Sequence, residues 1–343
     1  LLHWAAILNL PKEKHLTARI LVKYSGDSVT VLQIVGNQSG AGKTSLAAAL
    51  TIKANAIGKK VAYFKPFSDA PNLDPDSAFI SLLLQSLGGS AVTASNKPNV
   101  SDNLNGIQAA VAKLQSAADI VITEGSNTTN PLEIDGKVLL VFQPTKQSSI
   151  TDAISAAGPN LGGIIANAVP IHRRDELARD LSSQNVPVAV IPESRGMLTI
   201  TVEQLANHLG GRWVLDPVNN DLPVERFMIG GNILDEGPTY FDRYPNQAVI
   251  TRVERPDIQM ASMGEKTCCL VLTGPGEPTE YIKAEALKRE VPLIQVRTNT
   301  MDTVEALDGL INQADARTIT KANHFADLLD TYMDAYALQQ LLN

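Results

Sequence analysis

Residues 29–56 read VTVLQIVGNQSGAGKTSLAAALTIKANA, which places an apolar run, a glycine-rich turn and an alanine-rich segment in direct succession. The apolar run at 29–35 predicts a buried strand, and the alanine and leucine residues after position 44 predict a helix. Between them, the glycines of residues 36–44 let backbone N–H groups point inward at the start of that helix. A strand, a glycine-rich turn and a helix in this order predict a site that binds phosphate groups.

The turn also carries the two side chains that such a site needs. Lys43 supplies a mobile positive charge for the phosphates, and Thr44 offers a hydroxyl group to Mg²⁺. The spacing differs by one residue from the common G-x4-G-K-[ST] pattern, because Asn37 stands at the position of the first glycine and Gly36 lies one position earlier. We expect the phosphates of a nucleotide to be bound by Gly36, Gly40, Gly42, Lys43, Thr44 and Ser45.

A magnesium ion beside Thr44 needs further oxygen ligands, and two carboxylates are candidates. Glu124 ends the run DIVITE, where a strand of a parallel sheet presents its ligand-binding end. Asp76 lies in the segment NLDPDSAF, ahead of a predicted helix. We expect Thr44, Asp76 and Glu124 to hold the metal. The alternatives are a solvated carboxylate at Glu124 and a helix N-cap role at Asp76, with Asp74 as a second candidate ligand.

Composition limits the class of protein. A chain of 343 residues with 44% hydrophobic residues is long enough for about two domains with sizeable cores. The 29 Lys and Arg against 36 Asp and Glu give a net charge of −7 without a basic block, which argues against nucleic-acid or anionic-membrane partners. The apolar runs are too short to span a bilayer. The adjacent pair Cys268 and Cys269 lies in an apolar run and predicts core residues in a reducing cytoplasm.

Apolar runs alternate with helical segments along the chain, which is typical of an α/β fold with a parallel sheet. Prolines and asparagines then mark a linker, after which a smaller α/β unit follows. We expect an N-terminal extension at 1–28 without a functional role, a first domain at 29–214, a linker at 215–223, a second domain at 224–337 and a tail at 338–343.

The last predicted helix, 322–342, spaces its large apolar residues at intervals of three and four. This pattern puts Phe325, Leu329 and Tyr336 on one helix face. We expect that face to belong to a core or to contact a partner helix.

Further motifs resemble a known family when they are taken in order. YFKP at 63–66, TEG at 123–125, GGIIAN at 162–167 and VPVAVIPE at 186–193 look like dethiobiotin synthetase. They are still more similar to the P-loop NTPase-type domain at the front of long bacterial phosphate acetyltransferases. The resemblance implies a catalytic set of Lys43, Lys65 and Ser39, with adenine recognition by Asn167.

The departures from the synthetase pattern lie on the side of the organic substrate. Lys65 and Pro66 are followed by FSDAPN instead of the small turn that holds the substrate carboxylate. Ser126 and Asn127 stand where the synthetases have another glycine pair after the Glu-Gly dipeptide. Dethiobiotin synthesis is therefore not the expected reaction, while the nucleotide side is intact.

The second part of the chain resembles the DRTGG domain, which follows the P-loop unit in those acetyltransferases. RFMIG at 226–230, CLVLTG at 269–274 and NTMDTV at 299–304 carry the resemblance, which covers about 217–336. The signature segment is degraded to RVER at 252–255. The resemblance implies a regulatory role for this domain.

Two functions follow as hypotheses. The first is a cytoplasmic protein that binds ATP and Mg²⁺ and regulates through its DRTGG domain, as a homodimer or with a separate acetyltransferase chain. The alternative is an ATP-dependent ligase that activates a small carboxylate or carbamate by phosphoryl transfer. A complete phosphate acetyltransferase is not expected, because its catalytic region, of roughly 300 residues by ordinary domain sizes, has no counterpart in this sequence.

Overall fold

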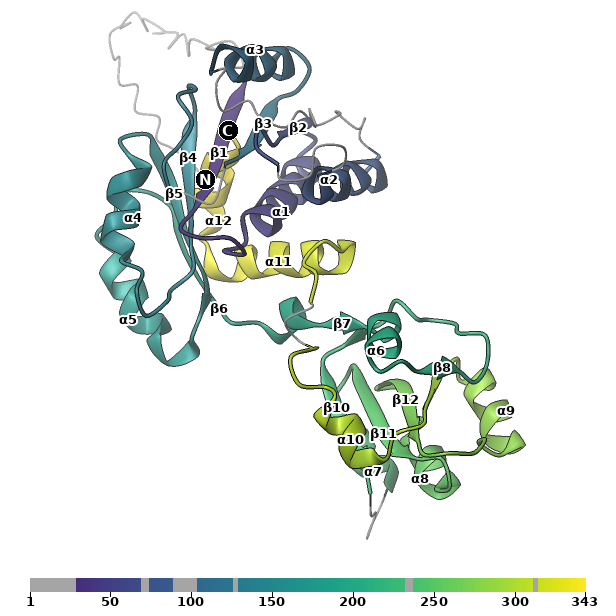
Figure 1. Ribbon diagram of the computed structural model, residues 1–343. Coiled ribbons are helices and arrows are strands. Elements are labelled where there is room, and N and C mark those ends of the chain that lie inside the picture. Colours follow the sequence, from purple (N-terminus) through teal and green to yellow (C-terminus); the bar gives the residue numbers. More distant parts are fainter. Residues whose placement is uncertain (1–28, 69–73, 89–103, 126–128, 232–236, 311–313) are drawn as a thin grey trace, which may run out of the picture.

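The computed structural model describes residues 29–68, 74–88, 104–125, 129–231, 237–310 and 314–343, which form two α/β bodies (Figure 1). The predicted extension at 1–28 and the Ser126–Asn127 pair lie outside the described residues.

The first body is built on a parallel sheet of six strands in the order β2-β3-β1-β4-β5-β6. Because all its neighbouring strands run parallel, their carboxyl ends meet at one edge of the sheet. The strands are β1 (Thr30–Gly36), β2 (Val61–Phe64), β3 (Ile120–Glu124), β4 (Lys137–Phe142), β5 (Leu161–Val169) and β6 (Val188–Pro192).

Helices cover both faces of this sheet, as the alternation of side chains along its strands requires. In β1, Leu32 and Ile34 face one layer, which contains α1 (Lys43–Ala56) and α2 (Pro75–Ser86). The alternate residues of the sheet face the other layer, which contains α3 (Leu104–Gln115), α4 (Ile150–Ala157) and α5 (Ile171–Leu181). The first body is therefore a parallel α/β sandwich of the predicted class.

The second body is a smaller mixed sheet in the order β10-β11-β12-β13-β8, in which β8 alone runs antiparallel to its neighbour. Its core includes the buried, unpaired Cys268 and Cys269, as predicted. The strands are β8 (Arg212–Trp213), β10 (Arg226–Gly230), β11 (Gln247–Arg252), β12 (Thr267–Thr273) and β13 (Leu293–Val296); the helices are α6 (Val202–His208), α7 (Gly237–Phe241), α8 (Pro256–Ser262), α9 (Glu280–Lys288) and α10 (Thr300–Glu305). A two-stranded ribbon pairs β7 (Ile200–Thr201) with β9 (Pro223–Val224).

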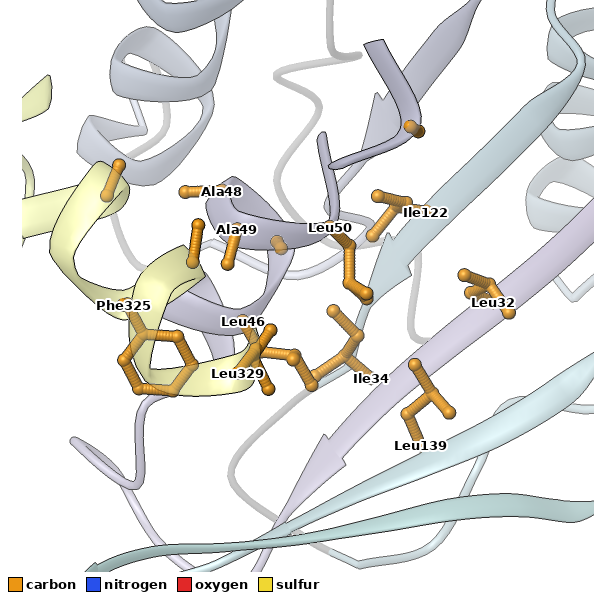
Figure 2. Packing of buried hydrophobic residues seen from close by; sticks show 14 of the residues in the cluster. Leu32, Ile34, Leu46, Ala48, Ala49, Leu50, Ile122, Leu139, Phe325 and Leu329 are labelled. Atoms are coloured by element: carbon orange, nitrogen blue, oxygen red, sulfur yellow. The ribbon is translucent and has the colours of Figure 1, made fainter. Parts of the chain in front are cut away.

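After the second sheet the chain returns to the first. Helix α11 (Ile319–Tyr332) buries Phe325 and Leu329 against α1 and the first sheet (Figure 2). Helix α12 (Ala335–Leu342) adds Leu338, Leu341 and Leu342 to the same core. The predicted single helix 322–342 is therefore two helices, which are separated at residues 333–334. Phe325 and Leu329 of the predicted apolar face lie in the core, but Tyr336, on α12, is exposed.

The limits of the two domains differ from the expected ones because the C-terminal helices return to the first body. Residues 319–337 were expected in the second domain, but they pack on the first sheet. Conversely, α6 lies in the core of the second body and β8 pairs with β13, so the chain leaves the first body before the expected linker at 215–223.

Two connectors therefore join the bodies: residues 193–199 lead out and residues 314–318 lead back. Lys321, which is 4% exposed, holds them together, because its Nζ donates to the carbonyl oxygens of Thr199 and Asp315, each at 2.7 Å. Burial lowers the pKa of Lys321 to about 8. Within the described ranges, no helix has both the length and the apolar character needed to cross a bilayer.

Candidate functional site

The glycine-rich loop lies at the carboxyl edge of the first sheet, between β1 and α1. Gly42 is the N-cap of α1 with a φ of 106°, a left-handed conformation that favours glycine. A Cβ atom at Gly42 would also overlap Nδ2 of Asn167, which donates a hydrogen bond to the carbonyl of Ala41 at 2.8 Å. The loop is therefore fixed both by its backbone and by a side chain from β5.

Lys43 crosses the inside of this loop. Its stem passes over Gly36, where a Cβ atom would lie 3.1 Å from the lysine carbons, and its Nζ donates to the carbonyl of Gln38 at 3.4 Å. The residue is 7% exposed. Burial lowers the pKa of Lys43, and the nearby charge of Glu124 opposes that shift. An anion in the loop would favour the charged form of this lysine.

Asn37, the departure from the usual loop pattern, ties the loop to the end of β4. Its Nδ2 donates to the carbonyl of Gln143, and its Oδ1 accepts from the Gln143 amide, both at 2.9 Å. A glycine at position 37 would lose both hydrogen bonds.

Thr44 and Glu124, two of the three expected metal ligands, lie within hydrogen-bond distance of each other. The Thr44 hydroxyl donates to Oε1 of Glu124 at 3.0 Å, and the Tyr63 hydroxyl donates to Oε2 at 2.7 Å. Glu124 is 2% exposed, and burial raises its pKa. Tyr63 was not predicted as part of the site; its only signal was its place in the YFKP motif.

These oxygen atoms fit a hard cation such as Mg²⁺. In the part of the chain that the structure describes, no group of three His, Cys, Asp or Glu side chains could hold a metal ion. A magnesium ion at Thr44 and Glu124 would thus complete its coordination with phosphate oxygens and water, as is usual for this ion.

Asp74 and Asp76 have different structural roles, although both pair with Lys65. Asp74 is the N-cap of α2, accepting from the Ser77 amide at 2.8 Å, and it also pairs with Lys65 at 2.9 Å. Asp76 is in the first turn of α2, and its Oδ2 pairs with the same lysine. Burial alone would lower the pKa of Lys65. The hydrogen bonds to Asp76 and Asp74 outweigh this effect and raise the pKa.

The second oxygen of Asp76 is bound by Arg317, a residue that no sequence motif marks. Arg317, on the returning connector, places its Nε 2.6 Å from Asp76 Oδ1 and its Nη1 3.1 Å from Asp315 Oδ1. The effect of burial on the Asp76 carboxyl is outweighed by its hydrogen bonds with Lys65 and Arg317, which lower its pKa. The Arg317–Asp76 contact spans 241 positions, so no local pattern could indicate it.

These side chains line one cavity of about 990 Å³, a volume that suits a nucleotide. Of its described lining residues, three are cationic and five are acidic, which leaves an excess of two negative charges. The lining includes the predicted Ser39 and Ser45 and the C-terminal end of β6. Its charged members are Lys43, Lys65, Arg317, Asp74, Asp76, Glu124, Glu193 and Asp315.

Comparison with known proteins agrees with this architecture. Residues 30–142 match a family model described as an AAA domain, and residues 204–310 match the model of the DRTGG domain. The chain joins a dethiobiotin-synthetase-like P-loop domain to a DRTGG domain. The start of the DRTGG match at residue 204 agrees with the position of α6 in the second body.

Three similar solved structures each match less than half of this chain. The CBS and DRTGG regulatory region of a Clostridium perfringens pyrophosphatase, complexed with the activator diadenosine tetraphosphate, is 14% identical, with a TM-score of 0.29, over 43% of this chain and 73% of that one. Cobyrinic acid a,c-diamide synthase from Mycobacterium smegmatis, with bound ADP and magnesium, is 19% identical, with a TM-score of 0.31. The match covers 48% of this chain and 87% of that one. A chain of the MinC:MinD cell division protein complex from Aquifex aeolicus is 17% identical, with a TM-score of 0.35, over 49% of this chain and 84% of that one.

Proposed function

We propose that this protein binds ATP with Mg²⁺ in its P-loop domain and that its DRTGG domain transmits the nucleotide state, as in a regulatory protein related to the front part of phosphate acetyltransferases. The observation that carries the proposal is the joint position of Lys43, Thr44 and Glu124 at one cavity below the glycine loop. We further propose that it acts in the cytoplasm, as a homodimer or with a separate acetyltransferase chain.

The charge of the cavity supports a requirement for the metal. An excess of two carboxylates repels a free polyphosphate, whereas a bound Mg²⁺ removes two negative charges from the complex. Thr44 and Glu124 offer that ion its protein oxygens. Asp76, the third expected ligand, has both of its oxygens bound by Lys65 and Arg317. Lys43 and the backbone N–H groups of the loop would then bind the phosphates.

The position of Asn167 supports binding of the base on the β5 side. It lies at the same cavity beside Ala168, and its amide nitrogen is already used by the loop. We propose that its carbonyl oxygen remains for an amino group such as that of adenine.

The ligase alternative is less well supported. It needs Lys65 to stabilise a transferred phosphoryl group. Lys65 is instead bound by both Asp74 and Asp76. Release of ADP that depends strictly on one small carboxylic acid would support the alternative.

Calorimetric titration of ATP with Mg²⁺ tests the proposal. The Lys43→Ala variant is expected to bind at least about 100-fold more weakly than wild type, because it removes a buried charge-assisted phosphate contact. Lys113→Ala, an exposed position on α3, is the control and should bind as wild type does. Equal affinity of wild type and Lys43→Ala would contradict the proposal.

A further inference from the structure

The returning connector, residues 314–318, places the guanidinium group of Arg317 at the cavity. Residues 314–317 belong to the cavity lining, together with the glycine loop and the start of α2. Arg317 lies just before α11, which packs on α1, and Lys321 of α11 binds the carbonyl oxygens of Thr199 and Asp315 on the two connectors. The position of Arg317 therefore depends on how the DRTGG domain is joined to the first domain.

Arg317 shares its carboxylate partner with another cation. Each oxygen of Asp76 is bound by a different one, Oδ1 by Arg317 and Oδ2 by Lys65. The charges of Asp76 and Lys65 also act on the pKa of Lys43, so the charged groups on this side of the cavity interact with one another. A cation that enters beside Asp76 would compete for this carboxylate, and a triphosphate would bring negative charge next to the guanidinium.

A guanidinium group is well suited to that charge. It is planar, remains protonated, and binds phosphate oxygens through two parallel hydrogen bonds. The side chain of Arg317 is 36% exposed and lines the cavity, so it is within reach of a ligand there.

We propose that Arg317 is a phosphate-binding residue for the terminal phosphate of a nucleoside triphosphate, held on Asp76 until the ligand arrives. The connector that returns from the second body thereby contributes one residue to the nucleotide site of the first. This inference rests on the proposed nucleotide binding. It predicts that Arg317 distinguishes a triphosphate from a diphosphate.

The test is calorimetric titration of a non-hydrolysable ATP analogue and of ADP, each with Mg²⁺, into the full chain. Arg317→Gln should bind the ATP analogue about tenfold more weakly than wild type and ADP within about twofold, because only the triphosphate has the group that Arg317 contacts. Arg317→Lys, which keeps the charge but loses the planar fork, should lie between wild type and Arg317→Gln.

Arg289→Gln is the matched control, because Arg289 also places its Nε 2.6 Å from a carboxylate oxygen, that of Glu285, on the second body. It should bind both nucleotides as wild type does. Unchanged or tighter binding of the ATP analogue by Arg317→Gln, or an equal loss for both nucleotides, would overturn the inference. If wild type binds neither nucleotide, the proposed function itself fails. If Lys43→Ala alone loses binding, only the role of Arg317 fails.

Discussion

Gly42 has two separate reasons to be glycine, which makes it a sensitive position of the loop. Its φ of 106° is unfavourable for any residue with a Cβ atom, and that atom would meet Asn167. We expect Gly42→Ala to weaken nucleotide binding at least about 100-fold by displacing the loop amides. Calorimetry with ATP and Mg²⁺ measures this loss.

Gly58 provides the control for that substitution. It also has a positive φ, 78°, but no atom lies near the position of its Cβ. Gly58→Ala should lower stability by about 1 kcal/mol while nucleotide affinity is unchanged. Equal effects of the two alanines on binding would show that backbone strain alone, and not the loop geometry, is responsible.

Tyr63 orients the carboxylate that would hold the metal. Its hydroxyl donates to Glu124 Oε2 at 2.7 Å in a buried position. Loss of such a supporting hydrogen bond typically weakens metal binding 10- to 100-fold. We therefore expect Tyr63→Phe to raise by about tenfold the Mg²⁺ concentration at which nucleotide binding is half-maximal. No change in this Mg²⁺ dependence would mean that Glu124 is held in place without Tyr63.

At this scale the sequence indicated residues that act through local spacing. Lys43 and Thr44 follow from the loop motif, and Glu124 follows from its place at a strand end, because parallel strands share their carboxyl edge. The choice between Asp74 and Asp76 stayed open, since an N-cap and a first-turn carboxylate look alike in sequence. Arg317 belongs to a contact between distant segments, which periodicity and spacing do not encode.

Helix α11 is the element that closes the first core. Leu329 is fully buried between α1 and the sheet (Figure 2). We expect Leu329→Ala to lower the free energy of unfolding by about 2–5 kcal/mol, whereas Leu287→Ala, on the exposed side of α9, should change it by less than about 0.5 kcal/mol. Urea denaturation checks both, and similar small effects would show that α11 is not part of that core.

The same helix shows what an apolar pattern can predict. The three- and four-residue spacing indicates that α11 has a buried face, but it does not indicate which sheet covers that face. The strands and helices were predictable because their periodicity is local. The domain limits were not, because the chain crosses between the bodies twice and its proline- and asparagine-rich segment at 215–223 follows β8, which already pairs with β13 of the second sheet.

For the molecule as a whole, the joint between the two bodies depends on Lys321. Its pKa of about 8 in the folded chain lies below its ordinary value of 10.5, so between these pH values the unfolded chain binds more protons. The contribution of Lys321 to stability therefore rises with pH in this window. We expect wild type to gain up to about 2 kcal/mol of unfolding free energy over Lys321→Met between pH 7.5 and 10.

Urea denaturation of wild type and Lys321→Met at several pH values measures this gain, and the other titrating groups cancel in the difference. A difference that is flat with pH would mean that Lys321 has an ordinary pKa and that the two carbonyl contacts do not bury it.

The central claim is that the cavity between the glycine loop and the returning connector holds a nucleoside triphosphate with Mg²⁺. A crystal structure with Mg²⁺ and a non-hydrolysable ATP analogue tests it most directly. We predict phosphates along residues 36–44, Mg²⁺ at Thr44 and Glu124, and the terminal phosphate between Lys43 and Arg317. A nucleotide bound elsewhere on the molecule, with this cavity empty at saturating ligand, would contradict the account.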